Sequence, residues 1–315
     1  MNPRINNTIL SEHKKCIINA DLDGILCGTI LSNALNWEVV GYSMCNGKIT
    51  DDLWLPEDIS TEDAMNECVF LDLPVVKSGV ATIDQHFNAF DDKDVSGYLN
   101  DYSKINPNML RSMYYSSSER GYTRKYPFGT IHFIIAVLEK YKKMVPIDIN
   151  KDLGGFKSID VLLRADRVIG NSVTYNANCK DWINYLAKDN NGIVTNTIRK
   201  IIFDGDLDIY SRRETMVEEM LKSYGCSRKD GDCSMLLMNG QYSDVFYIIM
   251  KIANIFGLKP PKVRSDLIRC HALTGQRYPI FGGDFSIAKR KTLERDVFSY
   301  AIVSSREVSI TKLKS

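Results

Sequence analysis

Short apolar segments separated by polar turns recur along the first half of this chain. Each is four or five residues long, the usual length of a buried strand, and they cover residues 16–20, 38–42, 68–71 and 80–83. A helical segment, 25–35, follows the first of them at once. Because strands that alternate with helices are typical of a parallel sheet, this half predicts an α/β fold with its sites beyond the carboxyl ends of the strands.

The middle of the chain changes from this pattern to a helical one. Residues 129–141 are apolar on almost every side, which predicts a buried helix and makes His132 a core histidine. The tract 91–127 is rich in Asp, Ser, Tyr and Asn and predicts a long, partly irregular surface excursion. Three further helices are then expected, at 182–187, 195–203 and 214–224.

The last ninety residues alternate again, and they predict a small mixed α/β domain. The expected strands are 234–238, 267–273, 298–304 and 308–312, with a helix at 243–256. The predicted fold class is therefore α/β, a mainly parallel sheet with flanking helices plus a smaller mixed α/β C-terminal domain. The expected domains are 1–188 for the main body, 189–226 for a helical linker and 227–315 for the C-terminal part.

Composition limits the class of protein without identifying it. The chain has 315 residues, 44% hydrophobic and 25% charged, which is ordinary for a globular protein of two domains. No apolar stretch approaches the ~20 residues of a membrane span, and no basic-then-apolar leader opens the chain. The eight cysteines are scattered without a Cys-x-x-Cys pair, so we expect reduced thiols and a cytoplasmic location rather than disulfides or structural zinc.

Charge is balanced overall but not along the chain. Residues 258–315 hold 12 Lys and Arg against 5 Asp and Glu, whereas the rest of the chain is acidic. A basic C-terminal part beside an acidic body suits a polyanionic substrate and a cation site, although a solvated charged surface would give the same pattern.

Carboxylates follow the predicted strands at several points. Asp21 and Asp23 come directly after 16–20, Asp72 follows 68–71, and Asp84 follows 80–83. The ends of neighbouring parallel strands meet at one edge of a sheet, so we expect these four side chains to converge. Carboxylates that repel one another in a buried place need a compensating cation, and oxygen ligands suit Mg²⁺ or Mn²⁺.

In these motifs the chain resembles the DHH phosphoesterase superfamily, which includes RecJ-type exonucleases, oligoribonucleases and cyclic-dinucleotide phosphodiesterases. Four motifs in consistent order between residue 14 and about 186 carry the resemblance: Asp21-Leu22-Asp23-Gly24 followed by Cys27-Gly28, the lone Asp72, Asp84-Gln85-His86, and Asp166. Tyr126-Pro127-Phe128-Gly129-Thr130 stands where the family begins the helix between its third and fourth motifs.

The resemblance implies a site of one or two Mn²⁺ or Mg²⁺ ions. Its ligands would be four aspartates: Asp21, Asp23, Asp72 and Asp166. His86 would contact the scissile phosphate, and together with Asp84 it would form the catalytic part of the site.

Two departures from the family pattern concern the metal ligands. The family's third motif reads Asp-His-His, and Gln85 stands at its first histidine, which is a metal ligand in the family. Many members also carry a histidine shortly before the first aspartate, where this chain has Ile17 and Asn19. An all-oxygen site would favour Mg²⁺ over Mn²⁺, and the loss of one ion or of activity is the alternative.

The C-terminal part offers a weaker match to a substrate-binding loop. The family carries a glycine-rich loop ending in histidine, whereas residues 281–284 read Phe-Gly-Gly-Asp. Besides His86, the residues expected to bind the substrate are Arg277, Gly282, Gly283, Lys289 and Arg290. Surface charges around a glycine turn are the other interpretation of these residues.

The function we expect is a metal-dependent phosphodiester hydrolase acting on short oligonucleotides or cyclic dinucleotides through metal-activated water. One alternative is a degenerate member that binds nucleic acid or nucleotides without cleaving them. Another is a haloacid-dehalogenase-type phosphatase with Asp21 as nucleophile, although that pattern wants threonine where Ile25 stands. The expected partner is the phosphodiester substrate, and no membrane association is expected. A homodimer is an open alternative.

Overall fold

The computed structural model describes residues 5, 8–45, 47–49, 51–115, 120–143, 147–228, 235–237, 242–280 and 284–314. By contacts the chain divides into two compact units, each built from separate segments. Unit 1 contains Met1–Asn19, Val39–Tyr126 and Asp266–Ser315, and unit 2 contains Ala20–Glu38 and Pro127–Ser265. The boundaries expected at 188 and 226 both fall inside unit 2 and stay predictions about domains.

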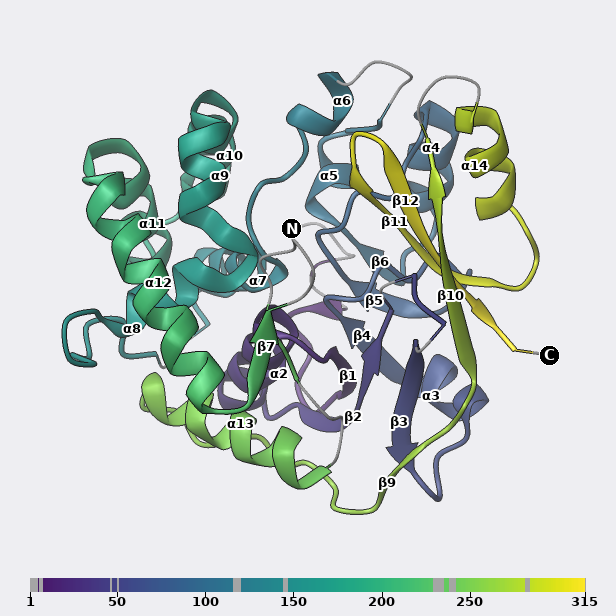
Figure 1. Ribbon diagram of the computed structural model, residues 1–315, viewed down its shortest axis with the longest axis horizontal. Coiled ribbons are helices and arrows are strands. Elements are labelled where there is room, and N and C mark those ends of the chain that lie inside the picture. The colour runs from purple at the N-terminus through teal and green to yellow at the C-terminus, as the bar shows by residue number, and fades with distance from the viewer. Residues whose placement is uncertain are drawn as a thin grey trace. The chain divides into compact units, whose positions relative to one another are not determined.

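Among the described residues of unit 1, seven strands form one sheet in the order β6-β5-β4-β1-β2-β3-β9 (Figure 1). In chain order they are β1 (Lys15–Asn19), β2 (Glu38–Met44), β3 (Asp52–Pro56), β4 (Cys68–Leu71), β5 (Ala81–Ile83), β6 (Lys104–Ile105) and β9 (Leu267–Arg269). The pairs β1–β4, β4–β5 and β5–β6 are parallel, whereas β2–β3 and β3–β9 are antiparallel. The predicted class is confirmed: an α/β fold with a mostly parallel sheet, flanking helices and a separate small sheet.

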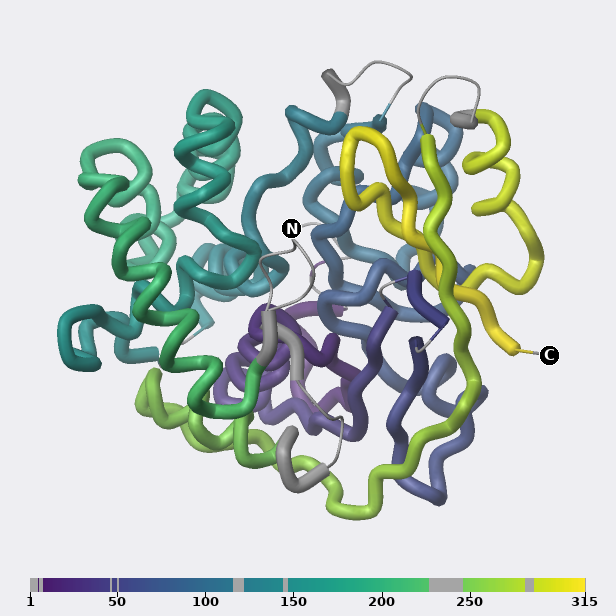
Figure 2. The backbone as a smooth tube through the Cα atoms, viewed as in Figure 1, coloured from purple at the N-terminus to yellow at the C-terminus, as the bar shows by residue number. Residues whose placement is uncertain are grey.

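The separate sheet is antiparallel and has the order β10-β12-β11. Its strands are β10 (Leu273–Pro279), β11 (Val297–Ser304) and β12 (Glu307–Leu313), with helix α14 (Asp284–Thr292) between the first two. Phe298 of β11 packs edge-on against Phe70 of β4, with 5.5 Å between ring centroids. A shared apolar core therefore joins the two sheets, and Figure 2 shows the last residues (yellow) returning to the early strands of this unit.

One predicted strand, 267–273, is divided in the structure. The chain pairs with β3 as far as Arg269, and Leu273 then opens β10 in the other sheet. Between them His271 has a φ of 52°, a left-handed conformation that no regular strand contains. An apolar run that crosses from one sheet to another looks continuous in the sequence, so the break was not predicted.

The tract 91–127, predicted as a long, partly irregular surface excursion, also contains regular structure. It contains helices α4 (Asp92–Asn100), α5 (Pro107–Leu110) and α6 (Arg120–Thr123) as well as strand β6. Val95, Tyr98 and Met109 are buried together in a small core cluster. These buried side chains anchor a tract whose other residues are largely polar and partly exposed.

Lys104, on the edge strand β6, is a buried cation enclosed by backbone oxygens. Its side chain is 3% exposed, and its Nζ donates to the carbonyls of Val75, Lys77 and Val80 at 3.2, 2.8 and 3.3 Å. Burial lowers the pKa of Lys104 to about 8, against the raising effect of the Asp101 and Asp84 charges. The three carbonyls supply the hydrogen-bond acceptors that a buried ammonium group requires.

Unit 2 is mainly helical. Its helices are α2 (Leu22–Leu35), α7 (Thr130–Lys140), α8 (Ser158–Arg164), α9 (Val168–Thr174), α10 (Asn176–Ala187), α11 (Ile193–Asp204), α12 (Leu207–Ser223) and α13 (Tyr242–Ile255). A short 3₁₀ turn, Ala165–Arg167, links α8 to α9, and a two-stranded sheet is made of β7 (Cys226–Arg228) and β8 (Met235–Leu237). The helix predicted at 129–141 is confirmed as α7, whose residues are buried from Thr130 to Leu138.

Candidate metal centre and acidic cluster

Two strand ends place Asp72 and Asp84 at the same edge of the sheet in unit 1. Strands β4 and β5 are parallel with Leu71 opposite Ile83, so the residue after each strand leaves the sheet at the same level. The backbone N–H of Asp72 donates to the carbonyl of Ile83 at 2.9 Å, which extends the ladder to this residue. Both carboxylates are 1% exposed. The convergence expected for this pair is therefore present.

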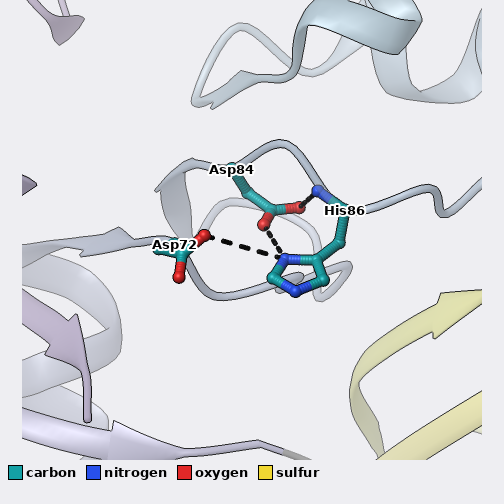
Figure 3. A group of neighbouring side chains, drawn as sticks. All are labelled: Asp72, Asp84 and His86. Atoms are coloured by element: carbon teal, nitrogen blue, oxygen red, sulfur yellow. Dashed lines mark hydrogen bonds and ion pairs between the residues drawn. The ribbon is translucent and has the colours of Figure 1, made fainter. Parts of the chain in front are cut away.

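His86 turns back onto the two carboxylates, as Figure 3 shows. Its Nδ1 lies 2.6 Å from Oδ1 of Asp84 and 3.9 Å from Oδ1 of Asp72, and its backbone N–H donates to Oδ2 of Asp84 at 3.1 Å. Because an ionised carboxylate only accepts hydrogen bonds, Nδ1 carries the hydrogen in this arrangement. The imidazole is thus oriented by Asp84, and its side chain keeps 29% exposure.

Asp72 is held in an unusual backbone conformation. Its φ is 58°, in the left-handed region where aspartate and asparagine are found more often than other side chains. Asn19, the last residue of β1, donates from Nδ2 to Oδ2 of Asp72 at 3.1 Å. The motif comparison identifies Asn19 only as a position without the family's histidine, whereas its hydrogen bond to Asp72 places it beside the site.

Asp72, Asp84 and His86 could together hold a metal ion, since each offers a ligand atom and these atoms lie within 4.8 Å of one another. The carboxylate oxygens can ligate an ion as they stand. Nδ1 of His86 carries a hydrogen while it donates to Asp84, so the imidazole could ligate an ion only through a ring nitrogen without a hydrogen. Two buried carboxylates beside one imidazole also have the excess negative charge that favours a cation. The residues therefore fit a divalent ion, whose identity the geometry does not determine.

The other predicted aspartates lie in unit 2. Asp21 is the N-cap of α2, where its Oδ1 accepts the backbone N–H of Gly24 at 2.9 Å. Asp23 is 1% exposed and is bound at the start of α7: Oδ2 accepts from Thr130 N–H at 2.6 Å and Oδ1 from Ile131 N–H at 2.8 Å. Backbone donors at a helix N-terminus stabilise an anion, so α7 supplies part of the compensation that a buried Asp23 needs.

The surroundings of Asp23 oppose its negative charge. Burial raises its pKa well above the ordinary value, and the charges of Asp166 and Asp21 raise that pKa further, while the two backbone donors of α7 lower it. Asp166 and Asp21 are therefore close enough to Asp23 for their charges to repel it. Their action on the same ions as Asp72 stays a prediction.

Asp166 stands in a tight turn between two helices. Asp166 and Arg167 have φ values of 50° and 53°, two successive left-handed residues without a glycine. Such a conformation costs free energy and persists only where surrounding contacts impose it. One of those contacts is Asn171 on α9, whose Nδ2 donates to the backbone carbonyl of Asp166 at 2.9 Å.

His132 is the satisfied core histidine that the sequence predicts. It is 3% exposed, its Nδ1 accepts the backbone N–H of Gly129 at 3.0 Å, and its Nε2 lies 3.1 Å from the carbonyl of Leu162. Burial lowers the pKa of His132 to about 4, so the ring is neutral at physiological pH. It joins the start of α7, which holds Asp23, to the end of α8, which leads to Asp166.

Neither a family model, nor a curated protein, nor a solved structure matches this chain. The resemblance to the DHH superfamily thus stays a prediction drawn from the motifs. Within the part of the chain that the structure describes, no helix has the length and apolar character needed to cross a membrane.

The basic residues expected to bind a substrate are partly engaged in ion pairs of the fold. Arg277 on β10 pairs with Glu307 on β12 at 3.0 Å, and Lys289 on α14 pairs with Asp91 and lies 4.0 Å from Asp94. Arg290, next to Lys289, is exposed. Gly282 and Gly283 lie outside the described residues. Substrate binding by this set stays a prediction.

Proposed function

We propose that this chain is a metal-dependent phosphodiester hydrolase that acts on short oligonucleotides or cyclic dinucleotides. The observation that supports the proposal is the buried group of Asp72, Asp84 and His86 at the carboxyl edge of a parallel sheet. This is the edge at which α/β proteins place their ligands. The position at this edge, the burial of both carboxylates and the oriented imidazole distinguish the group from an ordinary cluster of exposed acidic residues.

The residues that would hold a divalent cation, Mn²⁺ or Mg²⁺, are Asp72 and Asp84 in unit 1. The motif resemblance adds Asp21, Asp23 and Asp166 to the proposed ligands. When bound, such an ion lowers the pKa of a water molecule and neutralises charge on phosphoryl oxygens. The fit rests on two nearly unexposed carboxylates and an imidazole within ligand distance of one another.

Asp84 and His86 have the geometry of a proton-handling pair. The hydrogen bond between Nδ1 of His86 and Oδ1 of Asp84 has a donor–acceptor distance of 2.6 Å. The carboxylate therefore fixes the ring's tautomer, and it stabilises the imidazolium if the ring takes up a second proton. A partly exposed imidazole held in this way is suited to contact a phosphoryl oxygen and to move a proton to or from it.

The test is an assay of metal-free protein against protein loaded with Mn²⁺ or Mg²⁺, with short oligoribonucleotides and cyclic dinucleotides as substrates. We expect hydrolysis only in the loaded samples and a loss of at least ~100-fold in kcat for Asp84→Asn. Asp204→Asn is the control, because Asp204 is an exposed aspartate at the end of α11.

The outcomes separate the proposal from its two alternatives. Binding of a cyclic dinucleotide without hydrolysis, under any metal, would identify a nucleotide-binding protein that has lost catalysis. A phosphorylated Asp21 trapped during turnover would identify a dehalogenase-type phosphatase instead. Equal turnover by wild type and Asp84→Asn would remove the proposed site from the reaction.

A further inference from the structure

Two completely buried asparagines stand behind the loop that carries Asp84 and His86. Asn106 and Asn108 are both 0% exposed, and they flank Pro107 at the point where β6 ends and α5 begins. Asn106 is the N-cap of α5, where its Oδ1 accepts the backbone N–H of Asn108 at 2.9 Å. Capping a four-residue helix needs only this oxygen, whereas the amide nitrogens of both side chains point to other partners.

Both amide nitrogens donate to the site loop. Nδ2 of Asn106 lies 2.7 Å from the carbonyl oxygen of His86 and 3.3 Å from Oδ2 of Asp84. Nδ2 of Asn108 donates to the carbonyl of Gln85 at 2.8 Å and to Oδ1 of Asn106 at 3.1 Å. The carbonyls of two successive loop residues and one carboxylate oxygen are therefore fixed from the same side.

The second asparagine is itself anchored. Oδ1 of Asn108 accepts the backbone N–H of Tyr126 at 2.6 Å, which ties the pair to a segment distant in the sequence. Every amide oxygen and nitrogen of the two side chains thus has a partner. Fully satisfied buried networks of this kind specify one geometry, whereas leaving one member unpaired is costly.

We propose that Asn106 and Asn108 are positioning residues that hold the Asp84 carboxylate and the His86 ring in their working orientation. Asn106 donates a hydrogen bond to Oδ2 of Asp84, which leaves Oδ1 directed toward Nδ1 of His86. It also donates to the carbonyl of His86, which fixes the backbone that carries the ring. The expected effect of these asparagines on metal affinity rests on the proposed function. Their expected effect on the His86 ring does not.

Asn106→Asp distinguishes positioning from helix capping. The aspartate keeps the oxygen that caps α5. In its ionised form it loses both donations to the loop and adds a negative charge beside Asp84. Asn108→Asp likewise keeps the acceptor for Tyr126 and loses the donation to Gln85. It serves as the second variant if Asn106→Asp does not fold.

The matched control is Asn190→Asp in unit 2. Asn190 is 4% exposed, donates to the carbonyls of Ala136 and Leu186, and accepts the N–H of Gly192 at 2.9 Å. The same substitution therefore removes the same kind of donor from a buried asparagine that does not contact Asp84, Gln85 or His86. Its loss of stability calibrates the loss expected from a structural role alone.

The first measurement is Mn²⁺ affinity by calorimetry. Relative to wild type, we expect a decrease of about 10- to 100-fold for Asn106→Asp, as for other residues that orient metal ligands, and less than twofold for Asn190→Asp. Equal affinities in wild type and Asn106→Asp would overturn the positioning role toward the metal. If wild type binds neither Mn²⁺ nor Mg²⁺, the proposed function fails, and the second measurement alone decides the role of the asparagines.

The second measurement is the ¹⁵N spectrum of the His86 ring in metal-free protein at neutral pH. Wild type should show the Nδ1–H tautomer that the contact with Asp84 requires, and Asn190→Asp should show the same spectrum. Asn106→Asp should shift the ring toward the Nε2–H form that predominates in a free neutral histidine. An unchanged spectrum in a folded Asn106→Asp variant would show that the asparagines only stabilise the loop, and would overturn the proposal.

Discussion

Asp72 combines a left-handed backbone with a buried carboxylate, and the two properties respond differently to substitution. Asparagine tolerates the observed φ of 58° and keeps an oxygen for the donor of Asn19, but it has no charge. Alanine loses both the charge and the backbone preference. The conformation and the chemistry of this residue can therefore be tested separately.

For Asp72→Asn we expect a Mn²⁺ affinity at least tenfold below that of wild type with little change in unfolding free energy. For Asp72→Ala we expect the same loss of affinity together with a destabilisation of ~1–2 kcal/mol from the strained backbone. Calorimetry and urea unfolding give the two quantities. Retention of wild-type Mn²⁺ affinity by both variants would exclude Asp72 as a ligand.

At the scale of elements, Gly129 shows how closely the start of α7 approaches Asp23. A Cβ at this position would lie 2.6 Å from Oδ2 of Asp23 and 2.9 Å from its Cγ. The φ of Gly129 is −71°, which any residue can adopt, so only the lack of space requires glycine here. Asp23 is thus held by two donors and by contact with a residue that has no side chain.

Gly129→Ala is expected to destabilise the protein by ~1–3 kcal/mol, because either Asp23 or the first turn of α7 must move. Gly97→Ala is the control: Gly97 lies in helix α4, and a Cβ there meets nothing within 4 Å. That substitution should stabilise by ~0.5–1 kcal/mol through helix propensity. Chemical denaturation of both variants checks the prediction, and equal stability changes would contradict it.

The link between α7 and α8 through His132 predicts a dependence of stability on pH. The pKa of His132 is about 4 in the folded protein and about 6.5 in an unfolded chain, so the unfolded chain binds more protons between these values. The contribution of His132 is complete above pH 6.5 and declines as the pH falls toward 4, by ~3 kcal/mol.

His132→Gln is the variant that isolates this effect. Its side chain keeps an acceptor and a donor for Gly129 and Leu162 but does not titrate, whereas Asp23 titrates in both proteins and cancels in the comparison. The unfolding free energy of wild type minus that of the variant should be more positive at pH 7 than at pH 4.5. A difference independent of pH would mean that the ring is not buried in its neutral form.

The sequence predicted the elements that periodicity and strand composition define, and it missed those that tertiary contacts create. Strand 68–71 is observed with the predicted bounds, and Asp72 follows it as expected because a parallel strand must end where its apolar run ends. Asn106 and Asn108 were not predicted, since an Asn-Pro-Asn turn suits any loop and the sequence does not show which carbonyls its amides reach. The pairing of Asn19 with Asp72 depends likewise on the order of strands in the sheet.

Across the whole molecule, the basic character of the last sixty residues is less available than the sequence suggests. Arg277 and Lys289 neutralise carboxylates of the same fold, whereas Arg290, on the same helix as Lys289, is exposed. An ion-paired side chain must lose its partner before it can neutralise a phosphate, so charge counted along the sequence overstates the electrostatic attraction for nucleic acid.

We therefore expect oligonucleotide affinity to respond unequally to neighbouring substitutions. Arg290→Gln should reduce the slope of log affinity against log salt by ~0.7, the value for one phosphate contact on a single strand. Lys289→Gln should change that slope by less than half as much. Fluorescence anisotropy between 50 and 200 mM salt measures both, and equal slopes for the two variants would contradict the expectation.

The three backbone carbonyls around Lys104 also make this residue a probe of local opening at the edge of the sheet. Its side chain is 3% exposed, so an acylating reagent cannot reach Nζ while the carbonyls of Val75, Lys77 and Val80 enclose it. Modification must therefore wait until β6, an edge strand of two residues, separates from β5. The rate of Lys104 acylation, followed by peptide mass spectrometry, would report that local opening without any introduced label.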